Sequence, residues 1–311
     1  MIESAYTYRQ AIFVFHNSYH CDSAEDDKGF LLFTAEETGE TAMKSTAFSS
    51  QPSMKIGVTD SGIGGLTVVR ELMRQLPHES IVYFGDNRNC PYGNKEPETL
   101  VSLASGMFRT LDNHTPLKLG AVACNTTSAL LERFAPDFDF PLVGIVKPAA
   151  EKVAAKKLDS VGVLATVFTI NSGCYQEIIR RHNPNCQVFG QGSSRLAALI
   201  DSGHLDSPEI LEEIHQCMAP FAAQSSLKHI LLACTHYPIL EDIFRREYPQ
   251  FTFINPAKEQ VNTLKDYLNQ QNLLSQDSAP TFEIFTTGSP ELYTSMCQRL
   301  GLRPPDAIHT L

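Results

Sequence analysis

Two cysteines occupy matching positions in the chain, each at the polar end of an apolar run. Cys124 is followed by Asn125-Thr126, and Cys234 is followed by Thr235-His236. A thiolate is a base and a thiol is an acid, and a helix N-terminus directly after a cysteine would favour the thiolate. One such cysteine would more often be a small buried apolar side chain. Two in matching settings favour paired proton transfer by thiols of lowered pKa.

Other polar groups at predicted strand ends add to this chemistry. His236 lies two residues beyond Cys234, where it could polarise the thiol or carry a proton. Asp60 offers a carboxylate just before glycines at positions 62, 64 and 65, which match neither a dinucleotide fingerprint nor a Walker loop. We expect these glycines to form a tight turn or to hold a small anion. Metal ligation by Cys234 and His236 stays open, although no further ligands follow at zinc-like spacing.

The elements that must position these groups alternate between strand and helix. Apolar β-type runs occur at 55–59, 81–84, 120–123, 161–165 and 229–233, and a helical pattern follows the first of them. This alternation predicts parallel α/β layers, whose ligands bind beyond the carboxyl ends of the strands. Asp60 and Cys124 are 64 residues apart, and Thr166 and Cys234 are 68 apart. The similar intervals favour an internal duplication into two similar halves.

Composition limits the class of protein. With 42% hydrophobic residues among 311, the chain can form packed cores, and its net charge of -10 disfavours general binding to nucleic acid or to a membrane surface. No apolar run reaches the roughly 18 residues of a membrane helix, and no secretory signal is recognisable. Eight cysteines without a CxxC pair predict reduced thiols. We therefore expect a cytoplasmic protein.

Residues 1–53 are a polar segment without sustained periodicity, for which we predict a disordered extension that the catalytic unit does not need. The regular pattern of strands and helices begins at Met54. Two short apolar runs within the segment, Ala11–Phe15 and Phe30–Phe33, are the candidates for extra strands at a sheet edge.

Five motifs, in chain order, resemble the glutamate racemase family of the cofactor-independent aspartate/glutamate racemases. They are Ile56–Val68, Gly85-Asp86 with Pro91-Tyr92-Gly93, Ala123–Thr126, Ala165–Tyr175 and Cys234–Pro238. The resemblance implies an α/β fold of two pseudosymmetric flavodoxin-like parallel-sheet domains with the active site between them. The first domain would take residues 54–148 and about 255–311, and the second would take 149–254.

The resemblance also implies an activity and its residues. It implies an isomerase that interconverts L-glutamate and D-glutamate by proton transfer between two cysteines. The catalytic residues would be Cys124, Cys234, Asp60, His236 and Glu177. Substrate contacts would come from Asp60, Ser61, Pro91, Tyr92, Gly93, Cys124, Asn125, Thr126, Thr166, Thr235 and His236. No cofactor and no metal would take part, and the D-glutamate would supply peptidoglycan synthesis.

Three other functions stay open from the sequence. The same pair of thiols would serve a racemase of aspartate or of another acidic amino acid. Two thiols indicate the type of reaction, but they say little about the length of the substrate's side chain. Two similar halves would also suit a non-catalytic two-lobed protein that clamps an amino acid. A zinc hydrolase is the third. The expected partner is a small molecule, glutamate, rather than nucleic acid or membrane, and the oligomeric state is left open with a homodimer among the options.

Overall fold

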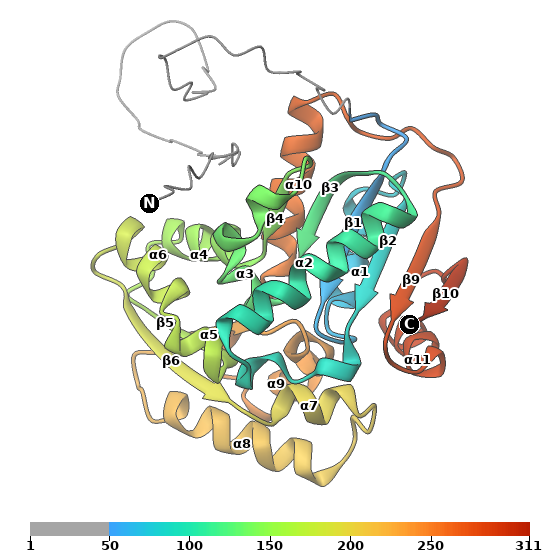
Figure 1. Cartoon of the computed structure of the whole chain (residues 1–311). Helices are drawn as coiled ribbons and strands as arrows, with labels where there is room; N and C mark the ends of the chain where they lie inside the picture. The colour runs from blue at the N-terminus through green and yellow to red at the C-terminus, as the bar shows by residue number, and fades with distance from the viewer. Residues whose placement is uncertain (1–49) are drawn as a thin grey trace, which may run out of the picture.

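The computed structural model describes residues 50–311, which form two parallel β-sheets (Figure 1). The six-stranded sheet has the order β10 (Ala307–Thr310), β9 (Phe282–Thr286), β2 (Ile81–Gly85), β1 (Lys55–Asp60), β3 (Leu117–Val122) and β4 (Leu142–Gly144). The four-stranded sheet has the order β6 (Gln187–Ser193), β5 (Ser160–Thr166), β7 (His229–Ala233) and β8 (Thr252–Ile254). Neighbouring strands are parallel throughout both sheets. The predicted parallel α/β architecture is confirmed.

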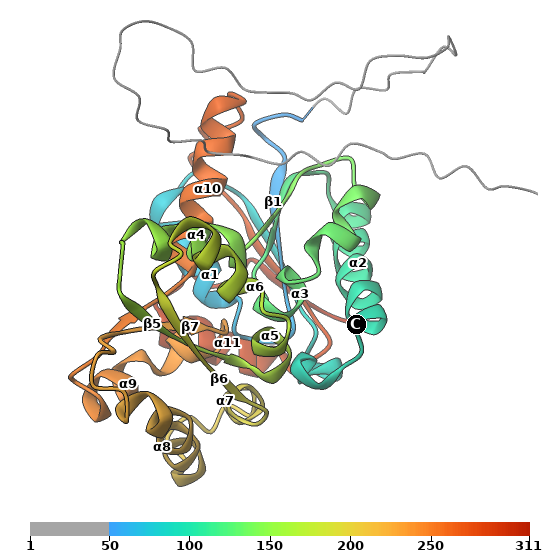
Figure 2. The same ribbon diagram turned by 90° about the vertical axis from the view of Figure 1, so that its left-hand side faces the viewer.

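Helices cover both faces of the larger sheet. One face carries α2 (Pro97–His114), and the other carries α1 (Leu66–Gln75), α10 (Ala257–Gln270) and α11 (Pro290–Leu300) (Figure 2). The remaining α-helices are α3 (Asn125–Ser128), α4 (Val146–Ala155), α5 (Val167–Asn171), α6 (Cys174–His182), α7 (Leu196–Asp201), α8 (Pro208–Ala222) and α9 (Glu241–Glu247). Cover on both faces explains why strands such as β1 and β3 are buried almost throughout. Within residues 50–311, no helix has both the length and the apolar character needed to cross a membrane.

One hydrophobic core joins the two sheets. Helix α1 buries Leu66, Val69 and Leu72 at helical spacing, and α4 packs against both α6 and α10. Buried side chains of both sheets belong to this single cluster, whereas a smaller cluster that includes Phe108 lies under α2. Because the larger core is continuous, the carboxyl ends of the two sets of strands are held in fixed positions relative to one another.

The chain crosses from one sheet to the other twice. The first crossing lies between the end of β4 and the start of β5, and the second lies between the end of β8 and the start of β9. Strand β9 then pairs with β2, and β10 pairs with β9, so the C-terminal stretch returns to the first sheet. We propose domain limits near residues 148 and 255, a division that these crossings support.

The start of the described chain is tied to a buried lysine. Residues 1–49, including Ala11–Phe15 and Phe30–Phe33, lie outside the described residues. Lys118 on β3 is fully buried, and its ammonium lies 2.6 Å from the Glu79 carboxylate. It also donates to the carbonyl oxygens of Leu273, at 2.8 Å, and of Pro52, at 2.7 Å. All three ammonium protons therefore have partners, one of which precedes Met54.

We expect a chain that begins at Met54 to be less stable than one that begins at Ser50. The shorter chain lacks the Pro52 carbonyl, and a lost hydrogen bond to a buried charged group costs about 1–3 kcal/mol. Urea unfolding followed by circular dichroism measures the difference. In chains that also carry Lys118→Met and Glu79→Gln, the two lengths should be equally stable. A difference that persists there would assign the effect to other contacts of residues 50–53.

Candidate active site

The carboxyl ends of four strands, two from each sheet, surround one cavity. Asp60 ends β1, Thr166 ends β5, Cys124 comes shortly after β3, and Cys234 directly follows β7. The cavity holds about 420 Å³ of empty space, part of it open to solvent. Its walls contain Ser61, Cys90, Pro91, Tyr92, Gly93, Asn94, Cys124, Asn125, Thr126, Thr166, Ser193, Ser194, Ala197, Cys234, Thr235 and His236. All the predicted substrate contacts except Asp60 are in this set.

Cys124 occupies the N-cap position of α3 at the wall of the cavity. Its thiol donates to the Ser61 hydroxyl at 3.8 Å. Burial, and next the Asp60 carboxylate, raise the pKa of Cys124 to about 11. The expectation of a lowered pKa is therefore wrong for this cysteine, because a four-residue helix has little dipole to set against burial and a neighbouring anion. At neutral pH, Cys124 is therefore a neutral thiol.

Cys234 lies beside a buried imidazole–carboxylate pair. Its Sγ is 3.7 Å from His236 Nδ1, and the opposite nitrogen, Nε2, is 3.1 Å from the Oδ1 atom of Asp201. Burial alone would lower the pKa of His236, but the charge and hydrogen bond of Asp201 outweigh it and hold that pKa well above the usual range. The pKa of Asp201 is lowered in spite of burial, chiefly by the charge of His236. A positive imidazolium therefore faces the sulfur of Cys234.

Asp201 is a largely buried carboxylate beside the site that the sequence analysis did not name. It ends α7, and besides its ion pair with His236 it accepts hydrogen bonds from the Ile63 amide at 3.0 Å and from Asn87 Nδ2 at 3.3 Å. These partners follow β1 and β2, so Asp201 joins the first sheet's loops to the histidine of the second. A carboxylate at the end of a short amphipathic helix has no distinctive spacing, and only the tertiary structure brings it to the site.

Glu177, the helper that the resemblance implied, is not brought to the cavity. It lies in the first turn of α6, where its side chain is 69% exposed and forms an ion pair with Arg181 at 2.6 Å. An exposed pair at this helical spacing is common on protein surfaces and contributes little stability. The carboxylate that lies next to His236 is Asp201, and we transfer no catalytic role to Glu177.

Asp60 lies behind the cavity wall, between the two halves. It is fully buried, accepts a hydrogen bond from Thr235 Oγ1 at 3.0 Å, and accepts another from the Gly62 amide at 3.2 Å. Burial raises the pKa of Asp60 to about 6, with His236 opposing that rise and Asp201 adding to it. Its charge thus acts on the Cys124 thiol without Asp60 forming part of the cavity wall.

The glycines after Asp60 allow the two halves to approach closely. A Cβ atom on Gly62 would lie 2.2 Å from a carboxylate oxygen of Asp201, and one on Gly64 would lie 2.5 Å from Thr235 Oγ1. This close approach is neither of the two roles expected for these glycines, and none of the three has a positive φ. The missing side chains leave room for groups of the second half next to the first.

Hydroxyl and amide groups line the rest of the cavity. Thr126 Oγ1 and Thr166 Oγ1 are 3.1 Å apart, which joins the two halves again. Asn125 accepts a hydrogen bond from Tyr175 at 2.6 Å, while its own side-chain nitrogen is buried without a protein partner among the described residues. A buried unpaired donor is costly, so a ligand oxygen at this position would be stabilised.

Comparison with known proteins identifies the family to which this site belongs. The sequence profile of Asp/Glu/hydantoin racemases matches residues 56–264. The chain belongs to this family. It is 35% identical to the glutamate racemase of Trichodesmium erythraeum over 260 residues, which cover 83% of this chain and 95% of that protein. As a member of this racemase family it is an isomerase.

Two solved structures share the fold of this racemase family member. A glutamate racemase isoform of Bacillus anthracis aligns with a TM-score of 0.76 and 32% identity, covering 84% of this chain and 98% of the other. The glutamate racemase of Francisella tularensis, solved with D-glutamate, aligns with a TM-score of 0.75 and 28% identity over the same shares of the two chains. The two-sheet arrangement around the cavity is thus the arrangement of racemases in this family.

Proposed function

We propose that this chain is a glutamate racemase that inverts the α-carbon of glutamate with Cys124 and Cys234. One observation carries the proposal: two buried thiols, one from each half of the molecule, line the same cavity between the halves. Inversion needs a base on one face of the α-carbon and an acid on the other. Thiols contributed from separate halves can approach a bound amino acid from opposite faces.

The two thiols lie beside groups of opposite charge. The His236 imidazolium can balance a thiolate on Cys234, whereas Cys124 is a neutral thiol. In one direction the Cys234 thiolate takes the α-proton, so a C–H bond breaks and an S–H bond forms. Cys124 then gives its proton to the other face and becomes the thiolate. In the reverse direction Cys124 starts as the thiolate. A proton on Asp60 would then remove the repulsion between the Asp60 carboxylate and that thiolate.

The intermediate carries its extra charge mainly on the α-carboxylate of the substrate. The free Asn125 amide and the Thr126 and Thr166 hydroxyls can donate to those oxygens. Donors fixed in place before the reaction stabilise developing charge more effectively than water does. This set of residues supports a reaction that uses no cofactor.

We propose glutamate, rather than another acidic amino acid, as the substrate because the similar proteins are named for it. The Trichodesmium and Bacillus proteins are named glutamate racemases, and the Francisella protein was solved with D-glutamate. We further propose that the D-glutamate serves peptidoglycan synthesis in the cytoplasm.

The test follows the circular dichroism of L-glutamate in deuterium oxide with the purified chain and no added cofactor. We expect the signal to decay to that of the racemate, with about one deuterium per inverted α-carbon. Dialysis against a chelator and treatment with a carbonyl-trapping amine should leave the rate unchanged. Decay with aspartate but not with glutamate would make the chain an aspartate racemase. Activity that needs restored metal or pyridoxal phosphate would overturn the two-thiol mechanism.

A further inference from the structure

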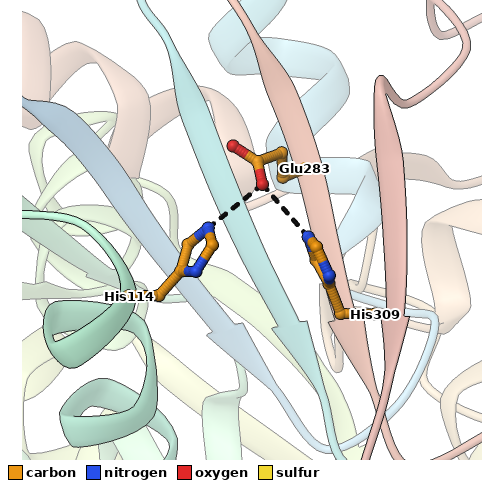
Figure 3. A group of neighbouring side chains, drawn as sticks. All are labelled: His114, Glu283 and His309. Carbon is orange, nitrogen blue, oxygen red and sulfur yellow. Dashed lines mark hydrogen bonds and ion pairs between the residues drawn. The ribbon is translucent and has the colours of Figure 1, made fainter.

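A second cluster of titratable side chains lies at the edge of the six-stranded sheet. It joins His114, the last residue of α2, to Glu283 on β9 and His309 on β10 (Figure 3). The Nε2 atoms of both histidines are 3.1 Å from the same carboxylate oxygen, Oε2 of Glu283. The three donor atoms all lie within 4.8 Å of one another. None of these three residues is among the described residues that line the candidate active-site cavity.

The donor set suits a metal ion of the zinc class. Each neutral imidazole offers a lone pair at Nε2 when its proton is on Nδ1, and the carboxylate adds an anionic oxygen. Zinc binds such nitrogens and oxygens at about 2.0–2.2 Å, so neighbouring donors in a tetrahedral site are about 3.4 Å apart. The two nitrogen–oxygen separations here are within a few tenths of an ångström of that value.

Neighbouring groups hold the three ligands in place. Lys55 on β1 forms an ion pair with the other oxygen of Glu283, Oε1, which leaves Oε2 facing the two rings. The ring of Phe285 stacks on His309 at a centroid distance of 4.4 Å and meets His114 edge-on at 4.8 Å. Supporting contacts of this kind orient metal ligands in proteins.

The cluster is also open to an ion from solution. Both histidine side chains are 37% exposed, whereas Glu283 is 17% exposed. An ion held by the three residues would therefore keep water at its remaining position or positions. Two imidazoles and one carboxylate favour Zn²⁺, Co²⁺ or Ni²⁺ over Mg²⁺ or Ca²⁺, which prefer oxygen ligands.

We propose that His114, Glu283 and His309 bind one divalent transition-metal ion of the zinc class. Strand β10 is the edge of the sheet and pairs only with β9. An ion bound by the three residues joins this strand to the end of α2 across β9. It stabilises the C-terminal edge of the first sheet and takes no part in the chemistry of the cavity.

Cobalt titration of the metal-free full chain tests the site, because Co²⁺ reports its ligands in the visible spectrum. We expect one ion per chain with d–d bands of nitrogen and oxygen ligands, and a melting temperature that rises with Co²⁺. His114→Ala and His309→Ala should each weaken this binding at least about 10-fold, since loss of even an outer-shell partner costs that much. The matched control is His215→Ala, which removes an exposed histidine paired at 3.1 Å with a single carboxylate, Glu247. It should bind Co²⁺ as the unaltered chain does.

The same titration can contradict the proposal in two ways. Binding that is unchanged when both His114 and His309 are replaced would show that the ion is held elsewhere. Thiolate-to-cobalt charge-transfer bands without the expected d–d bands would assign the ion to cysteines. Racemisation by both alanine variants should equal that of the unaltered chain, so the result for the metal site is independent of the proposed glutamate activity.

Discussion

Replacing either Cys124 or Cys234 by serine is expected to lower kcat for glutamate racemisation at least about 1000-fold in both directions. A hydroxyl is a much weaker acid than a thiol, and general acid–base groups contribute about 10²- to 10⁴-fold to rates. The remaining thiol can still act on the face of the α-carbon that it meets. We therefore expect each variant to exchange the α-proton of only one enantiomer with solvent deuterium, the two variants acting on opposite enantiomers.

The matched control for this experiment is Cys297→Ser. Cys297 is also a buried free thiol, but it lies on α11 and does not line the cavity. Circular dichroism gives the racemisation rate, and nuclear magnetic resonance gives the exchange at the α-carbon. A Cys124→Ser or Cys234→Ser variant that keeps near-normal rates, or one that exchanges both enantiomers equally, would contradict the two-thiol assignment.

The placement of each cysteine at the end of a strand could be predicted because it depends on local signals. Apolar runs in the sequence became β3 and β7, and parallel strands present their carboxyl ends at one edge of a sheet. Cys124 and Cys234 come shortly after those ends, so each is placed at the ligand-binding edge of its own sheet, whereas their meeting in one cavity depends on how the two sheets pack. The five motifs, taken in their order along the chain, then indicated the racemase family.

The charge state of the site could not be predicted in the same way. Whether Cys124 is a thiol or a thiolate depends on burial and on Asp60, which is 64 residues earlier in the chain. The pairing of Asp201 with His236 and the burial of Lys118 against Glu79 likewise join residues from distant segments. Such contacts have no period or spacing in the sequence. Glu177 was expected as a helper only because the resemblance implied it, and the structure leaves it in an exposed helical pair.

Replacing Asp201 by asparagine is expected to lower kcat about 100-fold near pH 8. Near pH 6 it is also expected to destabilise the fold by about 3–5 kcal/mol, because a buried imidazolium then lacks its partner. Asp201 raises the pKa of His236 against the effect of burial, so in the variant that pKa falls. The imidazolium that would balance a Cys234 thiolate in the proposed mechanism is then lost as pH rises through the lowered pKa. Activity of the variant should recover in part towards low pH, whereas the unaltered chain keeps its imidazolium well above the ordinary pKa of histidine.

The free energies of unfolding of the unaltered chain and of the Asp201→Asn chain should also differ in a pH-dependent way. A raised pKa of His236 in the folded state contributes stability that is fully present below its unfolded value of about 6.5 and is lost as pH rises through the folded value. Asp201→Asn removes that contribution, so the gap in unfolding free energy should be large near pH 6 and narrow at high pH.

Glu177→Gln is the matched control, since it makes the same carboxylate-to-amide change on an exposed side chain. It should alter neither the pH–rate profile nor the stability by more than about 0.5 kcal/mol. An Asp201→Asn chain with the pH–rate profile of the unaltered protein would show that the carboxylate does not set the charge of His236.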